Sequence, residues 1–346
     1  MSDRADSVHA EITAAFIAAL EAGIEDPVNW SPPWAKGPNV MNAYNPVSGH
    51  HYAGGNRLIC AIHSWQHDIG RQWATYDQWA SLSVHTDECY AGRAVGKDKY
   101  TKPDREVCEI YGCVLVNVRR GERAICTLLR PLKFKEINEQ GQEVERIKAW
   151  APFKVFNASQ VSGFEAESPM TTAIVDISVD QAFEFAAIVG AEVEETVTGG
   201  AAFAPRPDKI IMPARNRWLE PERCFSTICH ELTHWTGHPH RLAREPQVTI
   251  AEGRAYDQMD YAREELVAEL GAAFLCAAFD RVATTRDDHL MYLKSWLAAL
   301  KEDPKALWNA SGKAQAATTY LTRLHDANVP MEDPFMIIAE MSVEVD

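Results

Sequence analysis

The sequence predicts an α+β protein with two domains, at residues 1–165 and 166–346. Its 346 residues are enough for two domains of ordinary size. Strand-like runs rich in β-branched and aromatic residues lie in the first part, at 110–118, 124–135 and 152–161. From residue 219 onward apolar residues recur at helical spacing, at 219–236, 258–280, 287–301 and 311–324. We therefore expect the first domain to combine helices with a sheet and the second to be mostly helical.

Local signals predict the remaining elements. Apolar spacing indicates helices at 8–24, 56–68, 74–83 and 178–189, and Ser178 or Asp180 is a candidate N-cap for the last of these. Residues 202–213 have the pattern of a hairpin or edge strand, and 163–173 is the best candidate linker.

Composition favours a soluble protein without a membrane partner. Hydrophobic residues make up 46% of the chain and charged residues 24%, and no apolar run approaches the roughly 20 residues that span a bilayer. The N-terminus carries acidic residues and lacks the basic-then-apolar order of a signal peptide. We expect a protein of the bacterial cytoplasm, in which the eight cysteines, none of them in a CxxC pair, are free thiols.

Charge divides unevenly between the two predicted domains. The formal net charge is −15, of which residues 1–165 contribute −2 and the rest −13. Residues 91–154 have a local excess of five positive charges. This asymmetry predicts different partners for the two domains.

The strongest functional signal is the segment HELTH at 230–234. On a helix, His230 and His234 lie four residues apart and share a face, so both imidazoles can bind one Zn²⁺. Glu231 lies on the adjacent side, where its carboxylate can act as the general base for a metal-bound water. The segment therefore predicts a metallopeptidase-type site with Glu231 as the catalytic residue.

Two residues compete to be the third metal ligand. The longer segment HELTHWTGHPH matches a pattern in which His240 completes the site. The alternative is Glu265, on the Ala-rich predicted helix at 258–280. Glu269 lies one turn further along and would accept a hydrogen bond from a ligand histidine. A buried carboxylate pair on an apolar helix is costly unless it is paired or metal-bound.

The same segments carry a resemblance to a known family. HELTHWTGH and YAREELVAELGAAFL resemble the metallopeptidase half of the ArdC-like antirestriction proteins of plasmids and phages. NPVSGHHYAGGN, WATYDQW, VRRGER and FKVFNASQVSG resemble that family's single-stranded-DNA-binding domain, in the same order. Residues 84–114 differ from the family's pattern and resemble an insertion.

The resemblance implies a zincin-like domain at 166–346 after a single-stranded-DNA-binding domain at 1–165. It implies zinc (or another divalent ion such as Mn²⁺) held by His230, His234 and Glu265, and a host protein as the peptidase substrate. Aromatic rings stack on unpaired bases and basic side chains hold phosphates. The predicted DNA contacts are Trp34, Tyr52, Asn56, Arg57, Trp73, Arg119, Arg120 and Lys133.

Three functions remain open at this point. The intact HExxH segment favours an active peptidase that protects incoming DNA from host defence. A non-catalytic protein that coats single strands and keeps a structural metal is the alternative. An acidic mimic of DNA that inhibits host nucleases is the third, because the second half is strongly negative.

Overall fold

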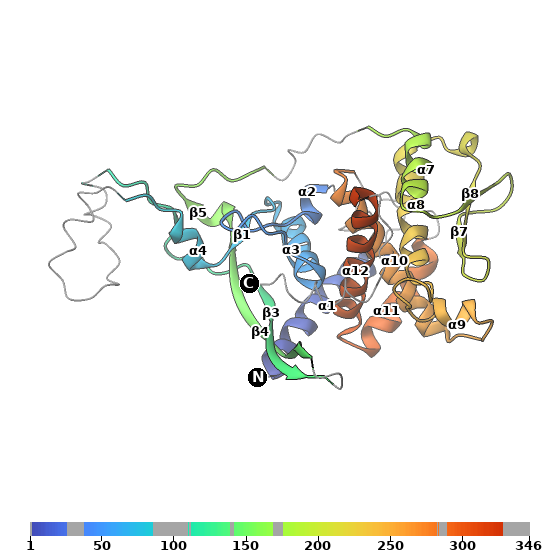
Figure 1. Ribbon diagram of the computed structural model, residues 1–346. Helices are drawn as coiled ribbons and strands as arrows, with labels where there is room; N and C mark the ends of the chain where they lie inside the picture. The colour runs from blue at the N-terminus through green and yellow to red at the C-terminus, as the bar shows by residue number, and fades with distance from the viewer. Residues whose placement is uncertain are drawn as a thin grey trace.

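The computed structural model is shown in Figure 1 and describes residues 2–25, 38–85, 110, 112–138, 142–168, 176–281, 283 and 289–327. The candidate contact Trp34 and most of the predicted insertion at 84–114 lie outside these residues. None of the helices within them is long and apolar enough to cross a membrane.

The first half builds two small sheets and four helices from its described residues. The helices are α1 (Ser2–Glu25), α2 (Pro38–Met41), α3 (Gly54–His67) and α4 (Tyr76–Ser81). The strands β1 (Trp73–Ala74), β4 (Glu143–Asn157) and β3 (Cys126–Ile137) form one antiparallel sheet in that order. The strands β2 (Asn117–Val118) and β5 (Val161–Ser162) pair separately, after the single turn η2 (Ala158–Gln160).

The second half is dominated by helices, as Figure 1 shows. It comprises α7 (Val179–Ile188), α8 (Pro221–Thr236), α9 (Gln247–Ala251), α10 (Gln258–Ala278), α11 (His289–Glu302) and α12 (Ala306–Ala327). Its sheet has the order β6-β8-β7, with β6 (Val193–Thr196) parallel and β7 (Ala202–Ala204) antiparallel to β8 (Lys209–Pro213). The single turn η3 (Arg215–Arg217) leads into α8.

One apolar core runs through both halves. It includes Phe16 of α1 and Leu58 of α3, together with Phe274 of α10, Trp296 of α11 and Leu321 of α12. Helix α12 packs against α3 on one side and α10 on the other (Figure 1). The predicted boundary near residue 165 therefore separates the sheets of the two halves, while the packing continues across it.

The α+β class is confirmed, and most predicted helices lie within a few residues of their expected bounds. Ser178 caps α7, since its side chain accepts from the N–H of Gln181 and the Gln181 side chain accepts from the N–H of Ser178. The prediction of a long strand at 110–118 is wrong, because among the described residues of this range only Asn117–Val118 pairs as a strand, with β5. Strand β4 begins at Glu143, nine residues before the predicted start, because it completes a long hairpin with β3.

Candidate metal centre

Helix α8 presents two buried histidines on one face. Pro221 opens the helix at a position where its missing N–H costs no hydrogen bond, and Gly237 follows the last turn. His230 and His234 are 3% and 5% exposed, and their Nε2 atoms lie 3.2 Å apart. Two imidazole nitrogens this close have to share either a proton or a cation between them.

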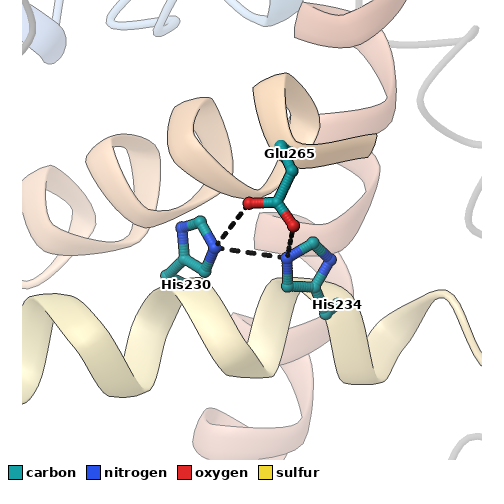
Figure 2. A group of neighbouring side chains, drawn as sticks. All are labelled: His230, His234 and Glu265. Carbon is teal, nitrogen blue, oxygen red and sulfur yellow. Dashed lines mark hydrogen bonds and ion pairs between the residues drawn. The ribbon is translucent and has the colours of Figure 1, made fainter. Parts of the chain in front are cut away.

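Helix α10 brings a carboxylate to the same point. Glu265 lies with one oxygen 3.4 Å from the Nε2 of His234 and the other 3.5 Å from the Nε2 of His230, as Figure 2 shows. Ligand atoms about 2.0–2.2 Å from a tetrahedral zinc ion lie about 3.3–3.6 Å from one another. The three observed separations therefore fit a single divalent ion at the centre of the triangle.

The two helices can approach this closely because α10 carries small residues where they cross. A side chain at Gly271 would lie 2.5 Å from both branch atoms of Thr233 on α8. Ala268 and Ala272 on the same helix are also buried. The approach holds the carboxylate of Glu265 against the histidine pair.

A second carboxylate orients His234 from behind. Glu264 lies 3.3 Å from the Nδ1 atom of His234, and the amide nitrogen of Gln247 lies 3.1 Å from the same atom. Arg244 in turn donates to both oxygens of Glu264, at 2.7 and 3.1 Å. With Nδ1 occupied in this way, Nε2 of His234 is left to face the centre.

Glu269 takes the corresponding place behind His230. Its carboxylate lies 3.7 Å from the Nδ1 atom, which is ion-pair distance but longer than a hydrogen bond. Glu264, Glu265 and Glu269 are all buried. These three carboxylates therefore do not form an exposed acidic face on α10.

The buried carboxylates make the centre strongly negative. Burial by itself would lower the pKa of His234, but Glu265 and Glu264 together raise it to about 10. Burial would raise the pKa of Glu265, but His234 and His230 hold it well below its usual range. The field that holds a proton on His234 is the field that would attract a divalent cation in its place.

The competing ligand lies elsewhere. His240 is exposed, its ring packs against His238 at a centroid distance of 4.9 Å, and its backbone N–H donates to that residue's Nδ1. Glu231 is 2% exposed and directly follows His230 on α8. The structure thus joins Glu265, and not His240, to the histidine pair.

Two family models match this chain in sequence. "N-terminal domain of anti-restriction factor ArdC" matches residues 6–157, and "Zincin-like metallopeptidase" matches residues 180–313. The metal-free crystal structure of antirestriction protein ArdC from plasmid R388 superposes with a TM-score of 0.67, at 26% identity, over 94% of this chain and 99% of that one. The chain is an ArdC-like protein.

A second structure and two relatives extend this result. The Mn(II)-bound form of R388 ArdC has a TM-score of 0.65 at 25% identity, over 92% of the ArdC-like chain and 98% of its own. Protein y4eC of Sinorhizobium fredii is 28% identical over 91% of each chain. The DNA primase TraC of Escherichia coli is 26% identical over 93% of this chain, which spans only 20% of that relative. The Mn(II)-bound structure and the zincin-like match support a divalent metal ion in this family.

The structure corrects part of the predicted DNA surface of the ArdC-like protein. Trp73 is fully buried because β1 pairs with β4 above the core, so its ring is not available to stack on a base. The Asn56 side chain is buried and bridges both backbone groups of Leu129. Arg57 is buried, with partners in α2 and α10. Tyr52 is half-buried and donates its hydroxyl to the carbonyl of Trp73.

Three of the predicted DNA contacts do reach solvent. Arg119 and Arg120 are exposed in the turn between β2 and β3, where Arg119 pairs with Glu122 at 2.8 Å. Lys133 is partly exposed on β3 and lies 3.6 Å from Glu145. These residues stay candidates for phosphate contacts.

Glu269 was predicted from the sequence to support a ligand histidine, but Glu264, Arg244 and Gln247 were not. Glu264 was indistinguishable from an exposed neighbour of Glu265, and nothing local connected it with Arg244 and Gln247. The available signal was the doubled glutamate on an otherwise apolar helix, since buried carboxylates need partners.

Proposed function

We propose that this ArdC-like protein binds single-stranded DNA and carries a zinc-dependent peptidase site, and that it protects incoming DNA of a mobile element from host defence. The observation that carries the peptidase part is the convergence of His230, His234 and Glu265 within contact distance, beside the buried Glu231. The match to the ArdC N-terminal domain and the likeness to antirestriction ArdC support the DNA part.

Each side chain of the centre has a distinct task in the proposed reaction. When bound, a divalent ion supplies Lewis-acid activation of a water molecule and of a peptide carbonyl. His230, His234 and Glu265 would hold that ion, Glu264 would orient the ring of His234, and Glu269 lies at ion-pair distance behind the ring of His230. Glu231 takes the proton of the attacking water and returns it to the leaving amine.

The experiment compares Glu231→Gln with Glu222→Gln, an isosteric change in the first turn of the same helix. Metal content is measured after dialysis, and cleavage is measured on a peptide library by mass spectrometry. We expect Glu231→Gln to retain the metal and lose cleavage, because an amide accepts no proton, and Glu222→Gln to retain both. Cleavage at the wild-type rate by Glu231→Gln would refute the assignment of the base.

Burial of the whole centre favours one alternative, a structural metal site in a DNA-coating protein. The two histidines, Glu231 and Glu265 are each at most 5% exposed, so a substrate could reach them only if this conformation opens. Metal bound stoichiometrically by a wild-type protein that cleaves no member of the library would support this alternative.

The DNA part is tested on the full-length protein by fluorescence anisotropy. Labelled single strands should bind more tightly than duplex, and affinity should fall as salt rises. The logarithm of the binding constant falls linearly with the logarithm of the salt concentration. Replacing Arg119 and Arg120 with glutamine should make this slope less steep by about 0.7 for each phosphate that these side chains neutralise in the wild type. The double change at the exposed Arg254 and Lys294 alters the net charge equally and should leave the slope unchanged. Equal affinity for duplex and single strand would exclude this part of the proposal.

A further inference from the structure

A cavity of about 500 Å³, lined mostly by residues with polar side chains, lies where the loop before α3 meets α12. Its walls are residues 49–53, Arg57 of α3, Ala278 of α10 and the face of α12 around Gln315 and Thr319. Figure 1 shows α3 and α12 side by side at this place. Ala278 is 13 residues from Glu265 along the same helix, about 20 Å, so the cavity is separate from the metal centre.

The charge of the cavity is opposite to that of the protein. The chain has a formal net charge of −15, yet the described residues that line the cavity include no aspartate or glutamate. They include two arginines, two histidines and several amide and hydroxyl groups. A concave site lined by cations and hydrogen-bond donors attracts anions.

Arg57 is a buried cation whose charge is not balanced. It is 6% exposed, its guanidinium lies 4.4 Å from the ring centre of Phe274, and its donors reach neutral acceptors in Met41, Asn42, Phe274 and Gln315. Within the part of the chain that the structure describes, no carboxylate lies within ion-pair distance of it. Burial lowers the pKa of Arg57 to about 9, so it is still charged at neutral pH. Buried charges are normally paired, and an anion in the cavity would supply the partner.

The N-terminus of α3 borders the same cavity. The helix is preceded by Ala53, which has no side-chain cap to offer, and its first turn contains no acidic residue. The N–H of Gly54 donates to the side-chain oxygen of Gln315 at 3.3 Å. A helix N-terminus carries a partial positive charge and favours anions. The helix N-terminus and the unpaired guanidinium charge are independent features, and both favour a negatively charged ligand.

We propose that this cavity binds a phosphate monoester on a nucleotide-sized group, as in a mononucleotide or the 5′-phosphorylated end of a DNA strand. The unpaired charge of a guanidinium and a helix N-terminus both favour the charged oxygens of a phosphate. The volume leaves room beyond the phosphate for a sugar and base. The site requires neither the metal nor the peptidase activity.

The test is isothermal titration of the full-length protein with 2′-deoxyadenosine 5′-monophosphate, inorganic phosphate and 2′-deoxyadenosine. The monophosphate should bind at least ten times more tightly than deoxyadenosine. Thr319→Glu places a carboxylate in the cavity without touching Arg57 and should weaken binding at least tenfold. Lys313→Gln changes the net charge equally on the exposed side of α12 and should have no effect. Equal binding of nucleoside and nucleotide, or equal effects of the two variants, would overturn the proposal.

A short oligonucleotide with and without a 5′ phosphate then identifies the source of the ligand. Tighter binding of the phosphorylated oligonucleotide than of the mononucleotide supports the proposal with a DNA end as ligand, and the reverse order supports it with a free nucleotide. Mononucleotide binding in a protein that shows no preference for single strands would leave this proposal standing while the DNA part of the proposed function fails.

Discussion

Replacing Gly271 with alanine tests whether the close approach of α8 and α10 builds the metal centre. An added Cβ would lie 2.5 Å from Cγ2 and Oγ1 of Thr233 and 3.0 Å from its Cβ. Ordinary contacts of this kind are at least 3.4 Å, so the helices have to separate by roughly 1 Å. Glu265 lies on the displaced helix, so its oxygens would move beyond the 3.4 and 3.5 Å that now separate them from the histidines.

The sign of the stability change distinguishes packing from helix propensity. Alanine is favoured over glycine inside a helix by about 1 kcal/mol. Overpacking a tight contact costs about 1–3 kcal/mol, and two atoms at 2.5 Å place this case near the upper end. We therefore expect Gly271→Ala to lower the free energy of unfolding by about 1–2 kcal/mol.

The control is Gly312→Ala on α12, where an added Cβ meets nothing within 4 Å. Only helix propensity changes at that position, so the free energy of unfolding of this variant should rise by up to about 1 kcal/mol. Unfolding in urea is followed by circular dichroism in the presence of a chelator, and metal affinity by competition with a chromophoric chelator. Thr233→Ala added to Gly271→Ala should restore part of both losses, since it removes the two closest atoms.

Gly271→Ala should also bind the metal at least tenfold more weakly than the wild type. If it is as stabilising as Gly312→Ala, the helices do not meet as tightly as the contact distances state. If it is destabilised but binds metal with unchanged affinity, the approach at Gly271 does not position Glu265.

Three further predictions concern single side chains. Glu265→Ala should lower the metal content retained after dialysis far more than His240→Ala, and the opposite ranking would assign His240 as the ligand. Arg244→Met leaves Glu264 buried without its partner and should lower the free energy of unfolding of the metal-free protein in urea by about 3 kcal/mol. Adding Glu264→Gln to this variant should restore much of that loss. A loss below about 1 kcal/mol would show that the ion pair contributes little to stability. Burial and His67 lower the pKa of His63 to about 4, so the folded chain binds fewer protons and loses stability as the pH falls from the unfolded value near 6.5 toward 4. Between pH 7 and pH 5 the free energy of unfolding of His63→Gln should therefore fall by about 1–2 kcal/mol less than that of the wild type. Equal decreases in the two proteins would contradict this prediction.

The sequence predicted α12 because its apolar spacing is set by burial on one side, whereas α8 and α10 were predicted although they are buried on all sides over most of their length. It predicted the histidine pair because spacing of four residues fixes two side chains on one helical face. The choice between His240 and Glu265 depends on how α8 and α10 cross, which is a tertiary property. Spacing therefore left both open, and the packing at Gly271 brings Glu265 to the histidines.

The aromatic residues of the first half show where sequence reasoning stops. Trp73 has the same neighbours in sequence whether its ring stacks on a base or fills the core, and only the pairing of β1 with β4 shows that it is buried. The first part of β4 was missed for the opposite reason. Residues 143–151 mix charged and apolar side chains on both faces, and none of them is fully buried, so they lack the alternation that marks a half-buried strand.

The continuous core has a consequence for the two functions proposed here. Leu58 on α3 and Phe16 on α1 belong to the same core as α10, the helix that carries Glu265. Arg57 ties the halves together directly, since it follows the first turn of α3 and donates to the carbonyl of Phe274 on α10. A fragment ending near residue 165 would expose this apolar face and leave Arg57 without those partners. DNA binding and metal binding therefore have to be compared in full-length variants, where a change at one site is measured with the shared core intact.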